Sequence, residues 1–158
     1  MANTQSMCTS FMGELLTATH NFGTAPTRGT SAADTFRGAL YLASATINAS
    51  TTVYSATGEV TGSGYSAGGI VVTNATPPSA TNSSATAGVA FFTPSASLTY
   101  TSVTLATAFD AVLIYNASQS NKAVSVHTFG SQTITAGTFT LTMPSNTTST
   151  ALLRLATT

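Results

Sequence analysis

The sequence contains very little charge. Its 158 residues include four Lys plus Arg and four Asp plus Glu, so the net charge is zero and 5% of the residues are charged. About a quarter is usual for a soluble domain. A monomer normally keeps its net charge away from zero, because a neutral surface promotes association. We therefore expect much of this surface to contact other protein, and we expect a homo-oligomer.

The shortage of cations excludes partners that need a basic surface. The four cations, which are balanced by acids and scattered along the chain, are Arg28, Arg37, Lys122 and Arg154. Nucleic acids and anionic membranes both select clustered Lys and Arg. The sequence therefore predicts no nucleic-acid partner and no membrane partner. Residues 1–19 also lack the basic and continuous apolar regions of a signal peptide, and no stretch has the length of a transmembrane helix.

Side chains that bind metals or carry out catalysis are also scarce. Those present are Cys8, His20, His127, Glu14, Asp34, Glu59 and Asp110. One cysteine cannot form an internal disulfide, and the acids have no calcium-loop spacing. The Gly-rich stretch "GSGYSAGG" has no following Gly-Lys-Ser/Thr, so it is no phosphate loop. We predict no metal and no cofactor.

One stretch nevertheless places three ionisable side chains close together. "FDAVLIYNASQSNKAVSVHTFG", residues 109–130, contains Asp110, Lys122 and His127. Its pattern is typical of a β-hairpin with a loop at 116–122, an apolar strand at 111–115, and Ser125 with His127 on the wetter face of the second strand. A Ser-His-Asp triad can be written with any of the many serines, and none lies in a G-x-S-x-G elbow. We predict no catalytic residue.

Residues 1–34 differ in pattern from the rest of the chain. Phe11, Leu15, Ala18 and Phe22 fall at i, i+4, i+7 and i+11, which predicts a short amphipathic helix. A Gly/Pro/Ser/Thr connector follows at 23–34. Phe11, Leu15 and Phe22 are the predicted packing face, which either anchors the subunit to a partner or lies beneath its own sheet.

Residues 35–158 predict a β domain. Short aromatic and β-branched runs, bounded by turn residues, occur at 37–44, 51–60, 68–74, 87–93, 96–105, 109–116, 122–130, 138–145 and 150–156. About nine strands at this spacing are typical of an all-β, β-sandwich or jelly-roll-like domain. We expect a Gly-rich crossing at 57–69 and an exposed polar loop at 73–88.

Three blocks of the chain carry a family resemblance. They are "MCTSFMGELLTATHNF", "DTFRGALYLASATINASTTVYSATGEVTGSGYSAGGIVVTN" and "AFDAVLIYNASQSNKAVSVHTFGSQTITAGTFTLTMPS". In this order they resemble small virion structural proteins of tailed bacteriophages. The resemblance implies residence in the virion, after assembly in the host bacterial cytoplasm, and it implies no reaction.

Three functions are compatible with these observations. The leading hypothesis is a non-enzymatic capsid decoration or cement protein that bridges major capsid subunits. The alternative is a tail component, such as an adaptor, a baseplate protein or a fibre-associated domain that contacts the host receptor. The 73–88 loop contains no aromatic residue, which favours the shell. The third hypothesis, an envelope polysaccharide hydrolase, needs paired carboxylates in a chain with four acids.

Overall fold

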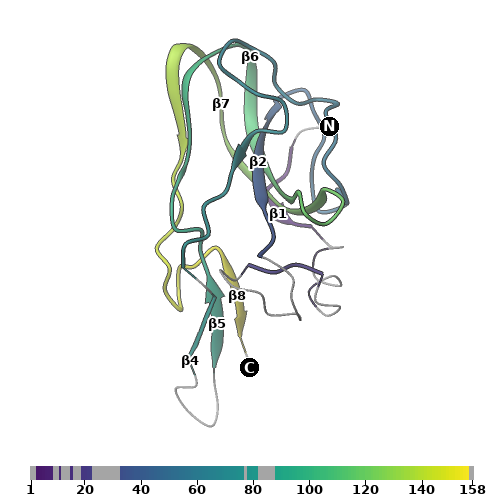
Figure 1. Cartoon of the computed structure of the whole chain (residues 1–158). Helices are drawn as coiled ribbons and strands as arrows, with labels where there is room; N and C mark the ends of the chain where they lie inside the picture. Colours follow the sequence, from purple (N-terminus) through teal and green to yellow (C-terminus); the bar gives the residue numbers. More distant parts are fainter. Residues whose placement is uncertain are drawn as a thin grey trace.

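The chain folds into two antiparallel sheets (Figure 1). The computed structural model describes residues 3–8, 11, 15, 19–22, 33–76, 78–81 and 88–156. The larger sheet has the order β1 (Ser6–Met7), β7 (Lys122–Leu141), β6 (Leu98–Asn116), β2 (Phe36–Leu42) and β3 (Ile70–Val71). The smaller sheet has the order β4 (Ser79–Thr81), β5 (Val89–Phe92) and β8 (Leu153–Ala156). The prediction of an all-β chain is confirmed.

The β6–β7 hairpin forms the centre of the larger sheet. Residues 111–115 are all buried between β2 and β7, as their uninterrupted apolar run predicts. The hairpin turns at 117–121, where Ser120 and Asn121 have positive φ. Along β7, Phe139 is buried while Thr138 and Thr140 are exposed, which confirms the predicted alternation.

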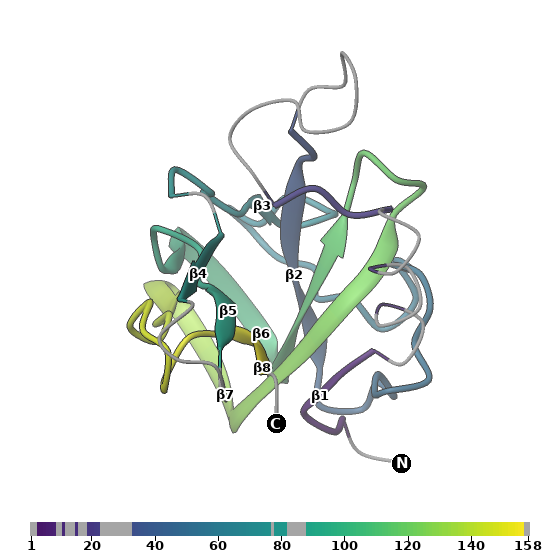
Figure 2. The same ribbon diagram turned by 90° about the horizontal axis from the view of Figure 1, so that it is seen from below.

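Two pairs of predicted strands are single long strands in the structure. The runs at 96–105 and 109–116 are joined in β6, and those at 122–130 and 138–145 lie largely in β7. Between the two runs of each pair, the chain forms β-bulges and not turns. The register shifts four times between Tyr100 and Ala111, with the extra residues alternating between the strands, and Ser102 and Ala136 have positive φ. The result is a long, bent ribbon (Figure 2).

The predicted Gly-rich crossing at 57–69 is present, and it lies directly on the backbone of the larger sheet. A Cβ at Gly62 would stand 2.0 Å from the carbonyl oxygen of Thr104, and one at Gly69 would stand 1.6 Å from that of Gly38. Only glycine permits this approach. The run at 51–60 was expected to be a strand, but it forms only isolated bridges at Val53 and Glu59 because it serves as the approach to this crossing.

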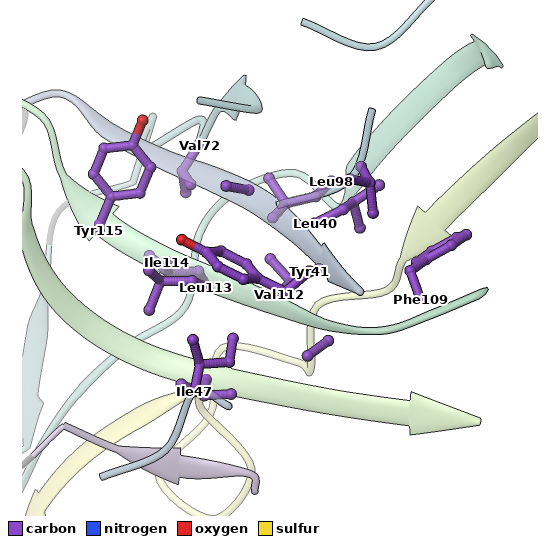
Figure 3. Packing of buried hydrophobic residues seen from close by; sticks show 14 of the residues in the cluster. Leu40, Tyr41, Ile47, Val72, Leu98, Phe109, Val112, Leu113, Ile114 and Tyr115 are labelled. Carbon is purple, nitrogen blue, oxygen red and sulfur yellow. The ribbon is translucent and has the colours of Figure 1, made fainter. Parts of the chain in front are cut away.

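The main core lies on the larger sheet. Side chains of β2 and β6 form most of the cluster drawn in Figure 3, and Ile47 and Val72 join it from connecting segments. Leu40, Val112 and Leu113 are completely buried. Because so many large side chains are enclosed here, this sheet provides most of the hydrophobic stabilisation.

The N-terminal segment is attached to the edge of the larger sheet. β1 pairs with β7 through Ser6 and Met7, and the Asn3 side chain donates to Leu42 O and to Asp110 Oδ1. Of the predicted helix, Phe11 and Leu15 have helical backbone, and most of its other positions lie outside the described residues. The helix therefore stays a prediction.

The segment at 73–88 is only partly the loop that its composition predicts. Its described residues are mostly exposed, as expected, but residues 79–81 form β4 and pair with β5. The sequence "SAT" has no strong strand preference, so the pairing depends on the apolar strand beside it.

Candidate docking site

Aromatic rings join the N-terminal segment to both sheets. Phe22 stacks on Phe36 of β2 with 4.3 Å between ring centroids, and it lies 5.2 Å from Phe92 of β5. The rings of Phe11 and His20 meet edge to face at 4.8 Å. Phe22 thus connects the two sheets, and each such ring pair adds to the stability gained from burial alone.

The smaller sheet has one apolar face, which is covered at one end only. Cross-strand partners share a face, so Phe92 lies beside Leu153, and Ala90 lies beside Leu155. Phe92 is 4% exposed beneath Phe22, whereas Leu155 is 63% exposed. This face therefore runs from a packed end to an open end.

An apolar pocket of about 170 Å³ lies along that face. Its wall combines the N-terminal segment with β5 and β8, and it consists of Met7, Phe11, Leu15, Phe22, Pro78, Ala90, Phe91, Phe92, Leu153, Arg154 and Leu155. An apolar cavity of about 150 Å³ stays dry and admits a molecule as large as benzene. The pocket can therefore hold one large apolar side chain.

All three residues of the predicted packing face line this pocket. Phe11 is fully buried, while Leu15 and Phe22 are partly buried against the core. The structure thus brings them together beside the smaller sheet. Anchoring of a partner by these residues stays a prediction.

Sequence reasoning missed the opposite wall. Phe91, Phe92, Leu153 and Leu155 were assigned to strands but not to a site. Their runs "VAFF" and "LLRLA" are short, so neither run shows on its own which apolar residue remains uncovered. The alternation Leu-Arg-Leu at 153–155, which places both leucines on one face of a strand and the arginine on the other, was the available signal.

A polar cluster fixes the end of the N-terminal segment to the central hairpin. Asp34 accepts hydrogen bonds from the amides of Asn116 and Gln119, at 2.8 and 3.0 Å, and from the backbone N–H of Asn21. Asn116 Nδ2 also lies 3.1 Å from Nδ1 of His20. Arg37, three residues after Asp34, donates instead to the carbonyl groups of Gly68 and Gly69.

Glu59 occupies a second polar cluster, beside Tyr41 of β2, with which it forms an isolated bridge. Its carboxylate is 6% exposed and accepts from the hydroxyls of Tyr54 and Tyr65, each at 2.6 Å, and from the N–H of Gly68 at 2.7 Å. The Gly68 carbonyl in turn accepts from Arg37. A buried charge that is fully hydrogen-bonded in this way is a structural element of the crossing.

All five tyrosines of the chain surround this cluster. They are Tyr41, Tyr54, Tyr65, Tyr100 and Tyr115. Burial raises the pKa of Tyr41 to about 12, with a further contribution from the Glu59 charge. Burial also raises the pKa of each of the other four, and in Tyr54 and Tyr65 the hydrogen bond to Glu59 adds to the effect. The hydroxyls therefore stay neutral donors through the physiological range.

The ionisable groups of the central hairpin do not form a triad among the described residues. Ser125 and His127 share a face, as predicted, and their side chains meet at 2.9 Å. That face is drier than expected: Ser125 is 5% exposed, and burial lowers the pKa of His127 to about 4. Asp110 instead accepts from Asn3. His127 is therefore a neutral imidazole that shares a hydrogen bond with the Ser125 hydroxyl.

The described residues contain no group of three or more His, Cys, Asp or Glu side chains that could hold a metal ion. Within the same part of the chain, no helix is long and apolar enough to cross a membrane. Comparison of the chain with protein-family models, with curated proteins and with solved structures finds no match.

Proposed function

We propose that the chain is a non-enzymatic structural protein of a bacteriophage virion, and more narrowly a capsid decoration or cement protein. The observation that carries this proposal is the partly covered apolar face of the smaller sheet, on a chain with zero net charge. An exposed leucine beside an apolar pocket is typical of a surface that contacts another protein.

The distribution of charge supports the same function. Residues 123–153 contain no Asp, Glu, Lys or Arg, and they include most of β7. Such a surface can lie against neighbouring subunits without burying unpaired charges, which is costly. Many copies on one shell then gain strength through multivalency, even where each contact is weak.

The described carboxylates support a non-enzymatic role. Asp34, Glu59 and Asp110 each bind their own set of donors, in three different parts of the structure. Hydrolysis of a polysaccharide by paired carboxylates needs two such groups within several ångströms of each other.

The finer architecture belongs to the same proposal. We take the two sheets as the halves of a sandwich-like domain, with Phe22 between them and the predicted N-terminal helix as one wall of the pocket. In the particle, the partners are the major capsid protein and further copies of this chain.

Copy number in purified particles tests this function. We expect this chain in numbers comparable to the major capsid protein, measured by quantitative mass spectrometry with labelled reference peptides. A copy number of a small fraction of that value would assign the chain to the tail instead. Absence from the particle would refute the virion proposal altogether.

A further inference from the structure

The outer edge of β8 lies beside the apolar pocket. β8 is the last strand in the order β4-β5-β8, and no backbone hydrogen bond joins it to any described segment other than β5. In an antiparallel pair, every second residue directs its N–H and C=O groups away from its neighbour. β8 therefore presents a regular set of donors and acceptors next to a pocket of about 170 Å³.

We propose that β8 is an acceptor edge for strand addition, where an extended segment of another protein pairs with β8 and inserts one large apolar side chain into the pocket. This inference rests on the proposed function in one respect: the partner is a neighbouring protein of the virion. Backbone pairing supplies affinity in this mode of recognition, and the pocket supplies specificity.

The two faces of β8 define the chemistry of the partner. Leu153 and Leu155 lie on the face that borders the pocket. Arg154 starts from the opposite face, where it is exposed; its side chain also reaches the pocket wall, and its Nε donates to the Thr148 carbonyl at 2.7 Å. Arg154 is the only charged residue of β4, β5 and β8. Neighbouring residues of an extended strand point to opposite faces. The partner segment therefore carries a large apolar residue flanked by an acidic residue, which lies opposite Arg154.

The edge is only partly protected against such pairing. Natural edge strands are blocked by shortness, charged side chains, proline or a bulge, and β8 has the first two, with Arg154 as its one charge, but neither proline nor a bulge. β8 has the sequence Leu-Arg-Leu-Ala and pairs with β5 in regular register over its whole length. An edge of this kind is suited to receive a strand, and its shortness keeps the interaction selective for a segment that also fills the pocket.

A peptide probe tests the proposal with the full chain. The probe is a fluorescein-labelled peptide Ser-Glu-Phe-Glu-Val-Thr, with two matched peptides in which Ala replaces Phe or Lys replaces both Glu. We expect saturable binding by fluorescence anisotropy for the first peptide. The Ala peptide should bind about tenfold more weakly, which corresponds to ~1.4 kcal/mol. Absence of saturable binding by the first peptide would overturn the proposal.

Two variants of the protein locate the binding site. Ala90→Trp fills the pocket from β5 and should weaken binding of the Phe peptide about tenfold. Ala80→Trp is the matched control, because Ala80 pairs with Ala90 but does not line the pocket. Arg154→Glu should make the Lys peptide the better ligand. Equal losses in both Trp variants, or an unchanged preference in Arg154→Glu, would place the peptide elsewhere and refute the assignment.

Hydrogen exchange gives an independent readout. Amides of residues 153–156 should be protected by the Phe peptide, while those of β3 remain unchanged. Protection of the same amides without peptide, together with a concentration-dependent dimer, would identify a second copy as the occupant and overturn the assignment to another protein. The copy-number measurement decides the virion proposal separately, so either proposal can fail alone.

Discussion

The two sheets of this chain enclose their interiors to different degrees. In the larger sheet, glycines let the 57–69 crossing pack directly against the strand backbone, and both oxygens of the Glu59 carboxylate accept hydrogen bonds. In the smaller sheet, an apolar face remains open at Leu155. The larger sheet thus buries its core without a partner, whereas the apolar face of the smaller sheet is left partly open. The buried core and the open apolar face therefore lie in different sheets.

The close approach of Gly69 to the backbone of β2 provides the strongest test of how tightly the larger sheet is packed. Gly69→Ala places a Cβ against the carbonyl oxygen of Gly38 at a residue with φ of 68°. We expect the free energy of unfolding in urea to fall by about 4 kcal/mol or more. Gly130→Ala is the control, because an added Cβ there meets nothing within 4 Å, and it should change stability by less than about 0.5 kcal/mol. Similar effects of both substitutions would contradict the close packing of the crossing.

Alkaline titration tests the tyrosine cluster. The pKa of Tyr41 is about 12 in the folded chain and about 10 when unfolded, so its contribution is complete below pH 10 and is lost as the pH rises towards 12. Over that interval Tyr41 alone accounts for about 3 kcal/mol. Tyrosinate absorbance should therefore rise together with the loss of the circular dichroism signal. Ionisation near pH 10 with an intact β spectrum would show that the tyrosines are accessible.

Replacement of the buried carboxylate should have a somewhat smaller effect. Glu59→Gln leaves one acceptor oxygen for three donors and introduces an amide NH₂ that faces groups which now donate to the carboxylate. We expect a loss of about 2 kcal/mol in the free energy of unfolding. Tyr54→Phe removes one donor only and should cost about 1 kcal/mol. If Tyr54→Phe proves as costly as Glu59→Gln, the carboxylate is not the organising group of the cluster.

The smallest effect on stability is expected at the open end of the smaller sheet. Leu155→Ser should change the free energy of unfolding by less than about 0.5 kcal/mol, because the side chain is 63% exposed. The same variant should nevertheless weaken binding of the Phe peptide. Val71→Ser, at an exposed residue of β3 in the larger sheet, is the matched control and should bind normally. A large stability loss in Leu155→Ser would mean that the open face supports the fold after all.

Sequence patterns predicted the parts of the fold that depend on local alternation. Residues 111–115 and the Thr138/Phe139/Thr140 alternation are where their patterns placed them, and the loop predicted at 116–122 is a turn at 117–121. The two long strands were divided incorrectly, because bulges depend on pairing between distant residues and leave no periodic signal. Phe11, Leu15 and Phe22 were predicted as one face, but the pocket depends on the opposite wall, which comes from strands more than 60 residues later in the chain.

The alternating bulges of the β6–β7 hairpin affect the tendency of the chain to aggregate at high concentration. From residue 129 to 141, the outer side of β7 carries no charge and no proline, and it pairs only with β6 among the described residues. A straight ribbon with this composition would invite stacking into fibres. The kinks at Ser102 and Ala136 interrupt the straight template that a fibre needs. The bent backbone thus gives this neutral edge a protection that charged side chains give to other edge strands.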